Sequence, residues 1–255
     1  MDEQTAHQWL REQGLDLILR PVALSHRSEQ ILRPTLNMLL AELSLQRSGL
    51  TVVQVGAFDG SSGDPLNCFL QLAPNVRAIL IEPQPIPFAV LKTRHAGNAN
   101  ITTINAAVAP ADGSCTLYVV EGQDPGDPWW SPQIASFSRD HLLRHAPSIP
   151  HLPERIRATE VPTLSPATLL REYRLPRIDA LVVDTEGADW QIVQLFLDQN
   201  IRPKVIYFEW RHLAPETIAS AVEILTGLGY RLEFLDVDLI ALGSFDEPDV
   251  PDDSP

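Results

Sequence analysis

Two acidic residues and a glycine follow an apolar stretch at a point where a strand is expected to give way to a helix. Asp184 and Glu186 come directly after the apolar run 178–183, and Gly187 follows them. In an open α/β sheet the carboxyl ends of the strands form the crevice that holds ligands, so acids at this edge face a ligand instead of the core. Such carboxylates can accept a proton from a substrate hydroxyl or hold that hydroxyl in place.

The helix expected after these acids does not need them. An amphipathic pattern predicts a helix over 189–199, with Asp189 as its N-cap residue. The alternative for Asp184 and Glu186 is that they only cap this helix or contact solvent. Because Asp189 can supply the cap, we favour a functional role for the other two acids.

A third acid and a histidine follow another apolar run. Glu209 comes at the end of the expected strand 204–208, and His212 lies shortly after it. If this strand neighbours the strand at 178–183, then Asp184 and Glu209 converge at one sheet edge. They could hold a divalent ion such as Mg²⁺ that orients a substrate diol, or one of them could act as a base. The candidate catalytic residues are Asp184, Glu186, Glu209 and His212, with Asp184 as the first choice.

A glycine-rich turn at the same sheet edge indicates which kind of ligand the crevice holds. The apolar run 50–55 predicts a strand that ends in Gly56, and the turn continues through Gly60 to a helix expected at 65–72 with Asp64 as its N-cap. A strand, a glycine loop and a helix N-terminus let a ligand approach the backbone closely and offer it unpaired N–H groups. The turn therefore predicts a cofactor at the tip of this strand.

The next apolar run ends in an acid that suits a ribose. Glu82 follows the expected strand 77–81, and a carboxylate at this position can accept hydrogen bonds from both ribose hydroxyls. A dinucleotide fingerprint would require a second glycine where the chain has Phe58. S-adenosylmethionine has a ribose but no phosphate, and it fits better because the turn backbone and the Ser61 hydroxyl can hold its carboxylate and amine.

Six short blocks of the sequence follow one another in a specific order. They are VVQVGAFDG (52–60), LIEPQP (80–85), INAAVAPADGSCTLYV (104–119), VPTLSPATLL (161–170), IDALVVDTEGADW (178–190) and VIYFEW (205–210). As an ordered set, these blocks resemble the FkbM-type S-adenosylmethionine-dependent methyltransferases. The resemblance implies a class I methyltransferase (Rossmann-like) fold and an enzyme that usually methylates a hydroxyl of a sugar or a secondary metabolite.

The resemblance also assigns roles within the cofactor site. Gly56, Ala57 and Gly60 would line the methionine end of S-adenosylmethionine, Glu82 the ribose and the region 106–107 the adenine. Together with residues taken from the turn itself, the candidate cofactor-binding set is Gln54, Gly56, Ala57, Gly60, Ser61, Glu82, Pro83, Ala106, Ala107 and Asp184. The expected product is S-adenosylhomocysteine.

Two positions depart from the family pattern. Gln54 replaces a common acid, and Val182 replaces a common lysine. The Gln54 amide can still hydrogen-bond the cofactor amine, whereas no lysine-dependent step is expected. Because the resemblance does not imply a metal, a divalent ion at Asp184 and Glu209 stays possible but is not favoured over a metal-free base.

The rest of the chain predicts a doubly wound α/β domain. Strands are expected near 50–55, 77–81, 101–105, 178–183 and 204–208, and helices near 65–72, 87–96, 189–199 and 215–226. A hairpin over 230–235 and 238–242 completes a mostly parallel seven-stranded sheet with an antiparallel last strand, as the resemblance implies. We expect an N-terminal helical extension at 1–49 with helices at 5–13 and 34–46, the methyltransferase domain at 50–245, and an acidic disordered tail at 246–255.

The segment 121–160 interrupts this alternation. It is rich in proline, and a long connection without regular structure is usually a lid, a binding loop or disordered. Tryptophans argue against disorder, so we expect a lid over the substrate, with contacts from Trp129, Trp130, Phe137 and His141. His141 and His145 could face the same way, but the spacing of these histidines and His151 does not favour a metal site. We expect the histidines to be solvated.

Composition excludes several classes of function. The 255 residues carry a formal net charge of −14, which argues against binding to a nucleic-acid backbone. No apolar run is long enough to span a bilayer, and residues 1–8 lack the basic start of a signal peptide. Cys68 and Cys115 have no metal-type spacing and indicate reduced thiols. We therefore expect a cytoplasmic protein that binds a small hydroxylated acceptor.

The expected reaction is an in-line displacement in which a substrate hydroxyl oxygen attacks the sulfonium methyl group. Alignment of oxygen, carbon and sulfur, exclusion of water and removal of the proton would supply the rate enhancement. Two alternatives stay open at this point. One is an oxidoreductase with a nucleotide cofactor, and the other is a binding module that kept the fold but lost turnover.

Overall fold

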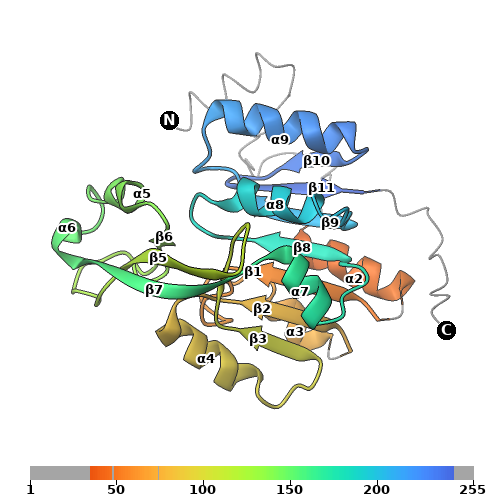
Figure 1. The fold of residues 1–255 in the computed structure, drawn as a ribbon, viewed down its shortest axis with the longest axis horizontal. Coiled ribbons are helices and arrows are strands. Elements are labelled where there is room, and N and C mark those ends of the chain that lie inside the picture. The colour runs from red at the N-terminus through yellow and green to blue at the C-terminus, as the bar shows by residue number, and fades with distance from the viewer. Residues whose placement is uncertain (1–34, 48, 74, 244–255) are drawn as a thin grey trace, which may run out of the picture.

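The computed structural model describes residues 35–47, 49–73 and 75–243, and a seven-stranded sheet forms its centre (Figure 1). The strands are β1 (Thr51–Val55), β2 (Arg77–Ile81), β3 (Ile101–Ile104), β8 (Ala180–Val183), β9 (Val205–Glu209), β10 (Arg231–Phe234) and β11 (Asp238–Leu242). Their order is β10-β11-β9-β8-β1-β2-β3, and β11 is antiparallel to both neighbours while the other pairs are parallel. The expected sheet with an antiparallel last strand is confirmed, and its switch point lies between β1 and β8.

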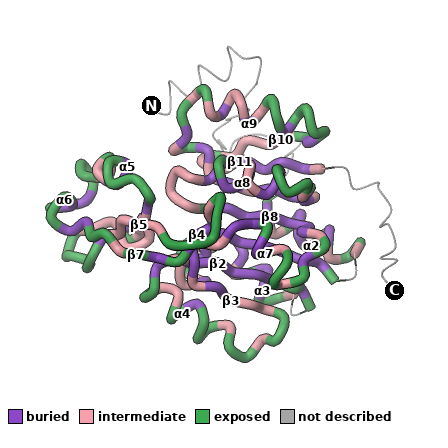
Figure 2. Tube along the Cα trace, in the orientation of Figure 1, coloured by how far each residue is buried: buried purple, intermediate pink, exposed green. Residues whose placement is uncertain are grey.

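Helices cover both faces of this sheet. One face carries α2 (Leu36–Gln46), α3 (Asn67–Leu72) and α4 (Pro85–His95), and the other carries α7 (Pro166–Glu172), α8 (Asp189–Leu197) and α9 (Pro215–Gly227). Because successive strand residues point to opposite faces, Val52 packs with the first group of helices and Val53 with the second. The buried residues concentrate in the central strands (Figure 2). All of these helices except α7 were expected from the sequence.

Two acids expected to cap helices make different contacts. The expectation that Asp64 caps a helix at 65–72 is wrong, because α3 begins at Asn67 and Asp64 Oδ1 accepts from the Leu66 N–H at 2.8 Å. Asp189 is the first residue of α8, and its carboxylate accepts from the N–H groups of Thr185 at 3.1 Å and Gly187 at 3.0 Å. Asp189 therefore fixes the loop that precedes its own helix.

A second, four-stranded sheet stands beside the main one. Its order is β4-β7-β5-β6, formed by β4 (Ala107–Val108), β5 (Gly113–Val120), β6 (Ala135–Ser136) and β7 (Ile156–Leu164). The expectation of a connection without regular structure over 121–160 is wrong, because this segment contains β6, α5 (Arg139–Leu143), α6 (Leu152–Arg155) and the start of β7. The long pairing of β5 with β7 supplies the backbone hydrogen bonds, and the prolines fall mainly in the turns between elements.

The residues between β5 and β7, 121–155, are called the arm below. They project from the main sheet (Figure 1) and have a small core of their own. The buried members of this core are Val120, Ile134, Leu142, Ile149, Leu152 and Ile156. The arm is therefore packed on itself and does not lie on the main sheet as a loose flap.

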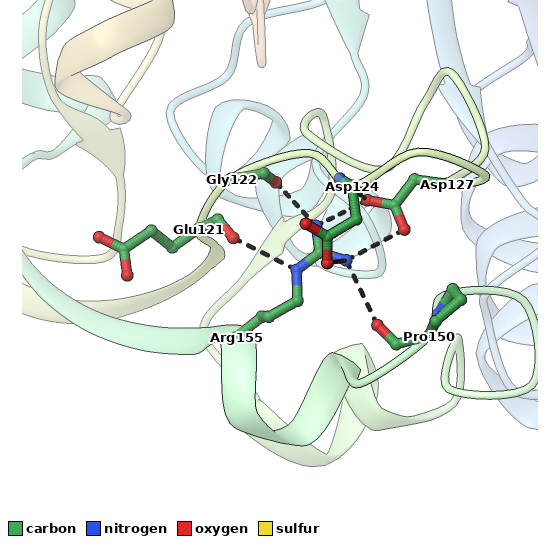
Figure 3. Close-up of polar contacts among 6 residues, drawn as sticks. All are labelled: Glu121, Gly122, Asp124, Asp127, Pro150 and Arg155. Atoms are coloured by element: carbon green, nitrogen blue, oxygen red, sulfur yellow. Dashed lines mark hydrogen bonds and ion pairs between the residues drawn. The ribbon is translucent and has the colours of Figure 1, made fainter.

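A buried arginine holds the start of the arm in place (Figure 3). The Arg155 guanidinium donates to Asp127 Oδ2 at 2.7 Å and Oδ1 at 3.0 Å, and to the carbonyl of Gly122 at 2.8 Å. It also donates to the carbonyls of Glu121 and Pro150, each at 3.3 Å. The hydrogen bonds from Arg155 lower the pKa of the Asp127 carboxyl. The chain that leads into the tryptophan pair is thereby tied to the end of α6.

Parts of the expected organisation cannot be compared with the structure. The expected helix at 5–13 and the expected acidic tail at 246–255 lie outside the described residues. Among the residues that are described, no helix is both long and apolar enough to cross a membrane.

Candidate active site

A cleft opens at the carboxyl ends of β1, β2 and β8. The second sheet and the arm complete its wall through Ala107, Leu117 and Phe137. This is the edge at which doubly wound sheets bind their ligands. Of the candidate cofactor-binding residues, the cleft is lined by Gly56, Ala57, Glu82, Pro83, Ala107 and Asp184. Gln54, Gly60, Ser61 and Ala106 do not line it.

The glycine turn shapes the cleft through close backbone packing. Gly56 has a φ of +84°, and a Cβ there would lie 1.8 Å from the carbonyl oxygen of Asp184. The expected unpaired N–H groups were largely wrong, because the Gly56 and Ala57 N–H groups both donate to the Ile81 carbonyl, at 2.9 and 3.0 Å. The Ser61 N–H donates in turn to Asp59 Oδ1 at 2.8 Å. The turn therefore leaves room for a ligand but offers it few hydrogen-bond donors.

Gln54 and Asp64 form a hydrogen-bonded pair. Asp64 lies at the wall of the cleft, and Gln54 lies behind it. Gln54 is buried, and its Nε2 donates to Asp64 Oδ1 at 2.9 Å. Asp64 lines the cleft, and both Gln54 Oε1 and Asp64 Oδ2 are buried without a hydrogen-bond partner among the described residues. Burial raises the pKa of Asp64, against the opposing effect of its hydrogen bonds. The free oxygen of Asp64 therefore lies at the cleft wall, where a cationic amine would satisfy it.

Asp64 is a site residue that the sequence did not reveal. Its position before a proline suggested a helix cap, and nothing nearby distinguished the two roles. The signal that could have found it is the replacement of the common acid by Gln54, because a missing charge at one position calls for a partner elsewhere. The structure supplies that charge ten residues along the chain at Asp64.

Glu82 stands at the tip of β2 with its carboxylate held by backbone. Its Oε2 accepts from the Phe58 N–H and its Oε1 from the Gln84 N–H, each at 2.8 Å. Burial raises the pKa of Glu82 to about 7, and the two backbone hydrogen bonds oppose the rise. Asn105 donates to the carbonyls of Glu82 and Pro83, at 2.8 and 3.0 Å, and so steadies this loop.

The three candidate catalytic acids meet at one edge, as expected. Strands β8 and β9 are parallel neighbours with Val183 opposite Phe208, so Asp184 and Glu209 follow at matching positions. Asp184 is exposed to the open cleft. The pKa of Asp184 is raised well above its ordinary value. The largest cause is loss of solvation inside the cleft, and the next is the charge of nearby carboxylates, first of all Asp189. A cation in the cleft would stabilise the ionised acid.

Glu186 and Glu209 are also difficult to ionise. Burial, and next the charge of Asp189, raises the pKa of Glu186 to about 7. Burial, followed by the charge of Glu186, raises the pKa of Glu209 to about 9. Glu186 has a φ of +54°, a left-handed conformation that non-glycine residues adopt at an energetic cost and often at functional sites.

Histidines from two distant parts of the chain gather beside these acids. His212 Nε2 lies 3.6 Å from Glu186 Oε2 and 3.5 Å from Glu209 Oε1. The ring centroids of His141 and His145 lie 5.3 and 5.7 Å from that of His212. The expectation of solvated histidines is wrong for His141, which is 8% exposed, because the loop at Gly187 covers its ring. His141 and His145 do face the same way.

Burial also controls the charge of these imidazoles. It lowers the pKa of His141 to about 4, with a further contribution from Arg144. It lowers the pKa of His212 to about 4 as well, with His141 as the next cause. These imidazoles are therefore neutral near pH 7 and have lone pairs to offer.

A wider groove of about 1190 Å³ adjoins the cleft. The two cavities share Val108, Ser136, Phe137 and Ile192, so they are continuous at this point. The groove is lined by His141 and His212 and, at its exposed rim, by Arg144 and Arg211. It is large enough to hold a small-molecule acceptor next to the cleft.

The four candidate substrate-binding residues fall in two groups. Phe137 and His141 line the groove. Trp129 and Trp130 line neither cavity. Trp129 is 67% exposed beside Gly63, and Trp130 packs in the arm with its ring centroid 5.4 Å from that of His145. A role of the tryptophans in covering the acceptor stays a prediction.

Comparison with known proteins identifies the family to which this cleft belongs. Residues 54–232 match the family model described as the methyltransferase FkbM domain. Among curated proteins none matches the chain. A methyltransferase FkbM structure from Methylobacillus flagellatus KT is similar at 12% identity and a TM-score of 0.44, over 76% of this chain and 44% of that chain.

Two further solved structures show similar levels of likeness. A precorrin-6y C5,15-methyltransferase from Geobacter metallireducens GS-15 is 16% identical with a TM-score of 0.39, over 86% of this chain and 94% of that chain. An O-methyltransferase from Bacillus cereus is 10% identical with a TM-score of 0.42, over 96% and 92% of the two chains. Because these scores are low, the fold assignment depends on the strand order and the family model.

Proposed function

Because the chain belongs to the FkbM methyltransferase family, and is thus an S-adenosylmethionine-dependent methyltransferase, we propose that it methylates a hydroxyl oxygen of a small molecule. The acceptor class we propose is a sugar or a secondary metabolite. The observation that carries this proposal is the continuity of two cavities at the sheet edge where Asp184 and Glu186 lie. One cavity would hold the methyl donor and the other the acceptor.

The residues of the cleft support one orientation of S-adenosylmethionine. Glu82 would accept the ribose hydroxyls, with Pro83 and Ala107 beside the nucleoside. The cofactor amine would meet the free oxygen of Asp64, which Gln54 holds from behind. The sulfonium methyl group would then lie near Asp184, where the raised pKa favours the arrival of a positive charge.

The acceptor would enter through the groove. Phe137 stands between the two cavities, and the neutral imidazole of His141 lines the floor beyond it. A hydroxyl that reaches past Phe137 toward Asp184 would attack the methyl group in line with the departing sulfur. The methyl–sulfur bond breaks as the methyl–oxygen bond forms, and the hydroxyl proton passes to a carboxylate, with Asp184 as the first choice.

The two alternatives are less well supported. A nucleotide-dependent oxidoreductase needs donors for a pyrophosphate, but the N–H groups of Gly56 and Ala57 are already bonded to Ile81. A binding module without turnover would not need an acid such as Asp184 open to the cofactor cleft. The two free cysteines and the net charge of −14 support the proposed cytoplasmic location and the absence of a nucleic-acid partner.

The test has two stages. Calorimetric titration with S-adenosylhomocysteine and, separately, NADH should give binding of the first alone. Purified protein with labelled S-adenosylmethionine should then be screened against hydroxylated sugars and polyketide or phenolic metabolites, with Asp184→Asn as the control for turnover. Label transfer to a nitrogen or carbon atom of the acceptor would contradict O-methylation. Binding of both ligands without transfer to any member of the panel would favour the non-catalytic alternative.

A further inference from the structure

Five side chains from three parts of the fold form two adjoining groups of potential metal ligands that share Glu186. His141 and His145 come from α5 and the turn after it, Glu186 from the loop after β8, and Glu209 and His212 from the end of β9 and its loop. We propose that this cluster binds a first-row transition-metal dication such as Zn²⁺. Glu186 is central, because it shares a compact group of potential ligands with the two arm histidines and another with Glu209 and His212.

The spacing of the atoms suits a metal ion better than direct hydrogen bonds. Within each group the potential ligand atoms lie within 4.8 Å of one another. His212 Nε2 is 3.6 Å from Glu186 Oε2 and 3.5 Å from Glu209 Oε1, beyond the usual length of an N–H···O bond. Two ligands bound tetrahedrally to Zn²⁺ at about 2.1 Å are about 3.4 Å apart. The observed separations therefore leave room for an ion between these atoms.

Two buried atoms of the cluster are also without partners. His141 Nε2 and Glu186 Oε2 have no hydrogen-bond partner within the described part of the chain. His141 is more than nine-tenths buried, and such orphaned groups are uncommon in native proteins. A metal ion would satisfy both atoms at once, although they come from different elements.

The local backbone is shaped to bring these groups together. Gly187 has a φ of +103°, and a Cβ there would lie 2.7 Å from Cε1 of the His141 ring. The glycine therefore lets the ring lie directly against the loop that carries Glu186. Because Glu186 itself holds a left-handed φ of +54°, both residues of the loop adopt conformations that side chains normally avoid.

The ligand types select the class of ion. Imidazole nitrogens suit Zn²⁺, Fe²⁺, Co²⁺ and Ni²⁺, whereas Mg²⁺ prefers oxygen ligands alone. This site differs from the Asp184 and Glu209 pair considered from the sequence, because Asp184 lies outside the cluster and stays available as a base.

The position of the site also suggests what the ion does. Glu186 lines the cofactor cleft, while His141 and His212 line the groove. A coordination position open to the groove would hold an oxygen of the acceptor next to the methyl donor. This role rests on the proposed function, whereas the binding of the ion does not.

The experiment uses the full chain, stripped with a chelator, dialysed and titrated with Co²⁺ and with Zn²⁺. We expect one ion per chain, a visible Co²⁺ absorption band of a low-symmetry site and displacement of Co²⁺ by Zn²⁺. His141→Gln, His212→Asn and Glu186→Gln should each weaken Co²⁺ binding at least tenfold. His151→Asn is the matched control, because His151 is an exposed arm histidine with a φ of +55° that asparagine tolerates.

Titration with S-adenosylhomocysteine on the same samples separates the possible outcomes. The histidine variants, whose residues do not line the cleft, must bind S-adenosylhomocysteine as the parent does, which shows that the cleft is intact. No saturable Co²⁺ binding by the parent, or equal binding by the three variants, would overturn the metal site and leave the methyltransferase proposal unaffected. Acetohydroxamate, a bidentate oxygen ligand, should shift the Co²⁺ band if a position is open to the groove. An unchanged band would overturn the role in holding the acceptor.

Discussion

Gly56 and Asp184 touch through their backbones where β1 and β8 end, and no side chain can be inserted between them. A Cβ at residue 56 would lie 1.8 Å from the Asp184 carbonyl oxygen. The glycine thus fixes the distance between the proposed cofactor turn and the loop that carries Asp184 and Glu186, the candidate catalytic acids.

Gly56→Ala should therefore disturb both stability and cofactor binding. We expect the free energy of unfolding to fall by more than about 2 kcal/mol, since the clash adds to the cost of a left-handed alanine, and S-adenosylhomocysteine affinity to fall with it. Gly229→Ala is the control, because Gly229 has a φ of +85° and open space around its Cβ position. Denaturant unfolding and calorimetry measure the two effects. Equal losses in both variants would contradict a role for the contact.

Glu82 should make cofactor binding depend on pH. Its folded-state pKa is raised to about 7 by burial, and ribose hydroxyls donate to the ionised carboxylate. Protonation therefore competes with binding, so the Kd of S-adenosylhomocysteine should rise as the pH falls below about 7, by up to about tenfold per pH unit. Glu82→Gln should remove this dependence, and Glu82→Ala should weaken binding by about 1.5 to 3 kcal/mol. A parent Kd that is flat from pH 5 to pH 8 would exclude the assignment.

Asp64 should bind the cofactor amine. Asp64→Asn keeps the size of the side chain but removes the charge, so affinity for S-adenosylmethionine and S-adenosylhomocysteine should fall about tenfold or more, the scale of a charge-assisted hydrogen bond. Asp59→Asn is the comparison, because Asp59 accepts from the Ser61 and Ser62 N–H groups and does not line the cleft. Calorimetry on both variants gives the answer, and a larger loss in Asp59→Asn would sink the idea.

Asp184 should matter for turnover more than for binding. Asp184→Asn keeps the shape of the side chain but removes the base, and kcat should fall about a hundredfold or more at saturating donor and acceptor. The Kd of S-adenosylhomocysteine should change little. If the parental kcat survives, Asp184 leaves the catalytic list, and Glu186→Gln, Glu209→Gln and His212→Asn are the variants to measure next.

The two tryptophans of the arm should behave differently. Trp130 is partly buried against His145 in the arm, so Trp130→Ala should destabilise the arm by about 1 to 3 kcal/mol through lost packing. Trp129 is largely exposed, so Trp129→Ala should leave stability unchanged and raise the acceptor KM if it covers the substrate. Urea unfolding and steady-state kinetics separate the two roles. An unchanged KM in Trp129→Ala would remove this tryptophan from the lid.

The main sheet was predictable because its strands are short apolar runs between clear turn signals. The run 77–81 and its closing Glu82 illustrate this, since pattern and sheet-edge chemistry point to the same place. The second sheet was missed because β4 and β6 have two residues each, and because the long strands β5 and β7 are largely exposed or half-buried, without a regular apolar alternation. The strand character of β4 and β6 depends entirely on pairing with distant partners, which no local pattern encodes.

The candidate site also has a part that the sequence predicts and a part that it does not. Asp184 and Glu209 could be paired from the sequence because parallel strands bring their ends to one edge. The meeting of His141 with His212 could not, because it depends on how the arm packs against the loops that follow β8 and β9. Local spacing within the arm gave only the weaker information that His141 and His145 face one way.

Val120 and Ile156 are partners in the β5–β7 ladder, so the chain leaves the second sheet and returns to it at one point. The segment between them contributes Phe137, His141 and Arg144 to the groove but no strand to the main sheet. Such a segment can lengthen, shorten or be exchanged between homologues while the methyl-donor half of the enzyme stays unchanged. With the acceptor in the groove as proposed, a change in the arm would change which acceptor is bound and would leave the methyl-donor site unchanged.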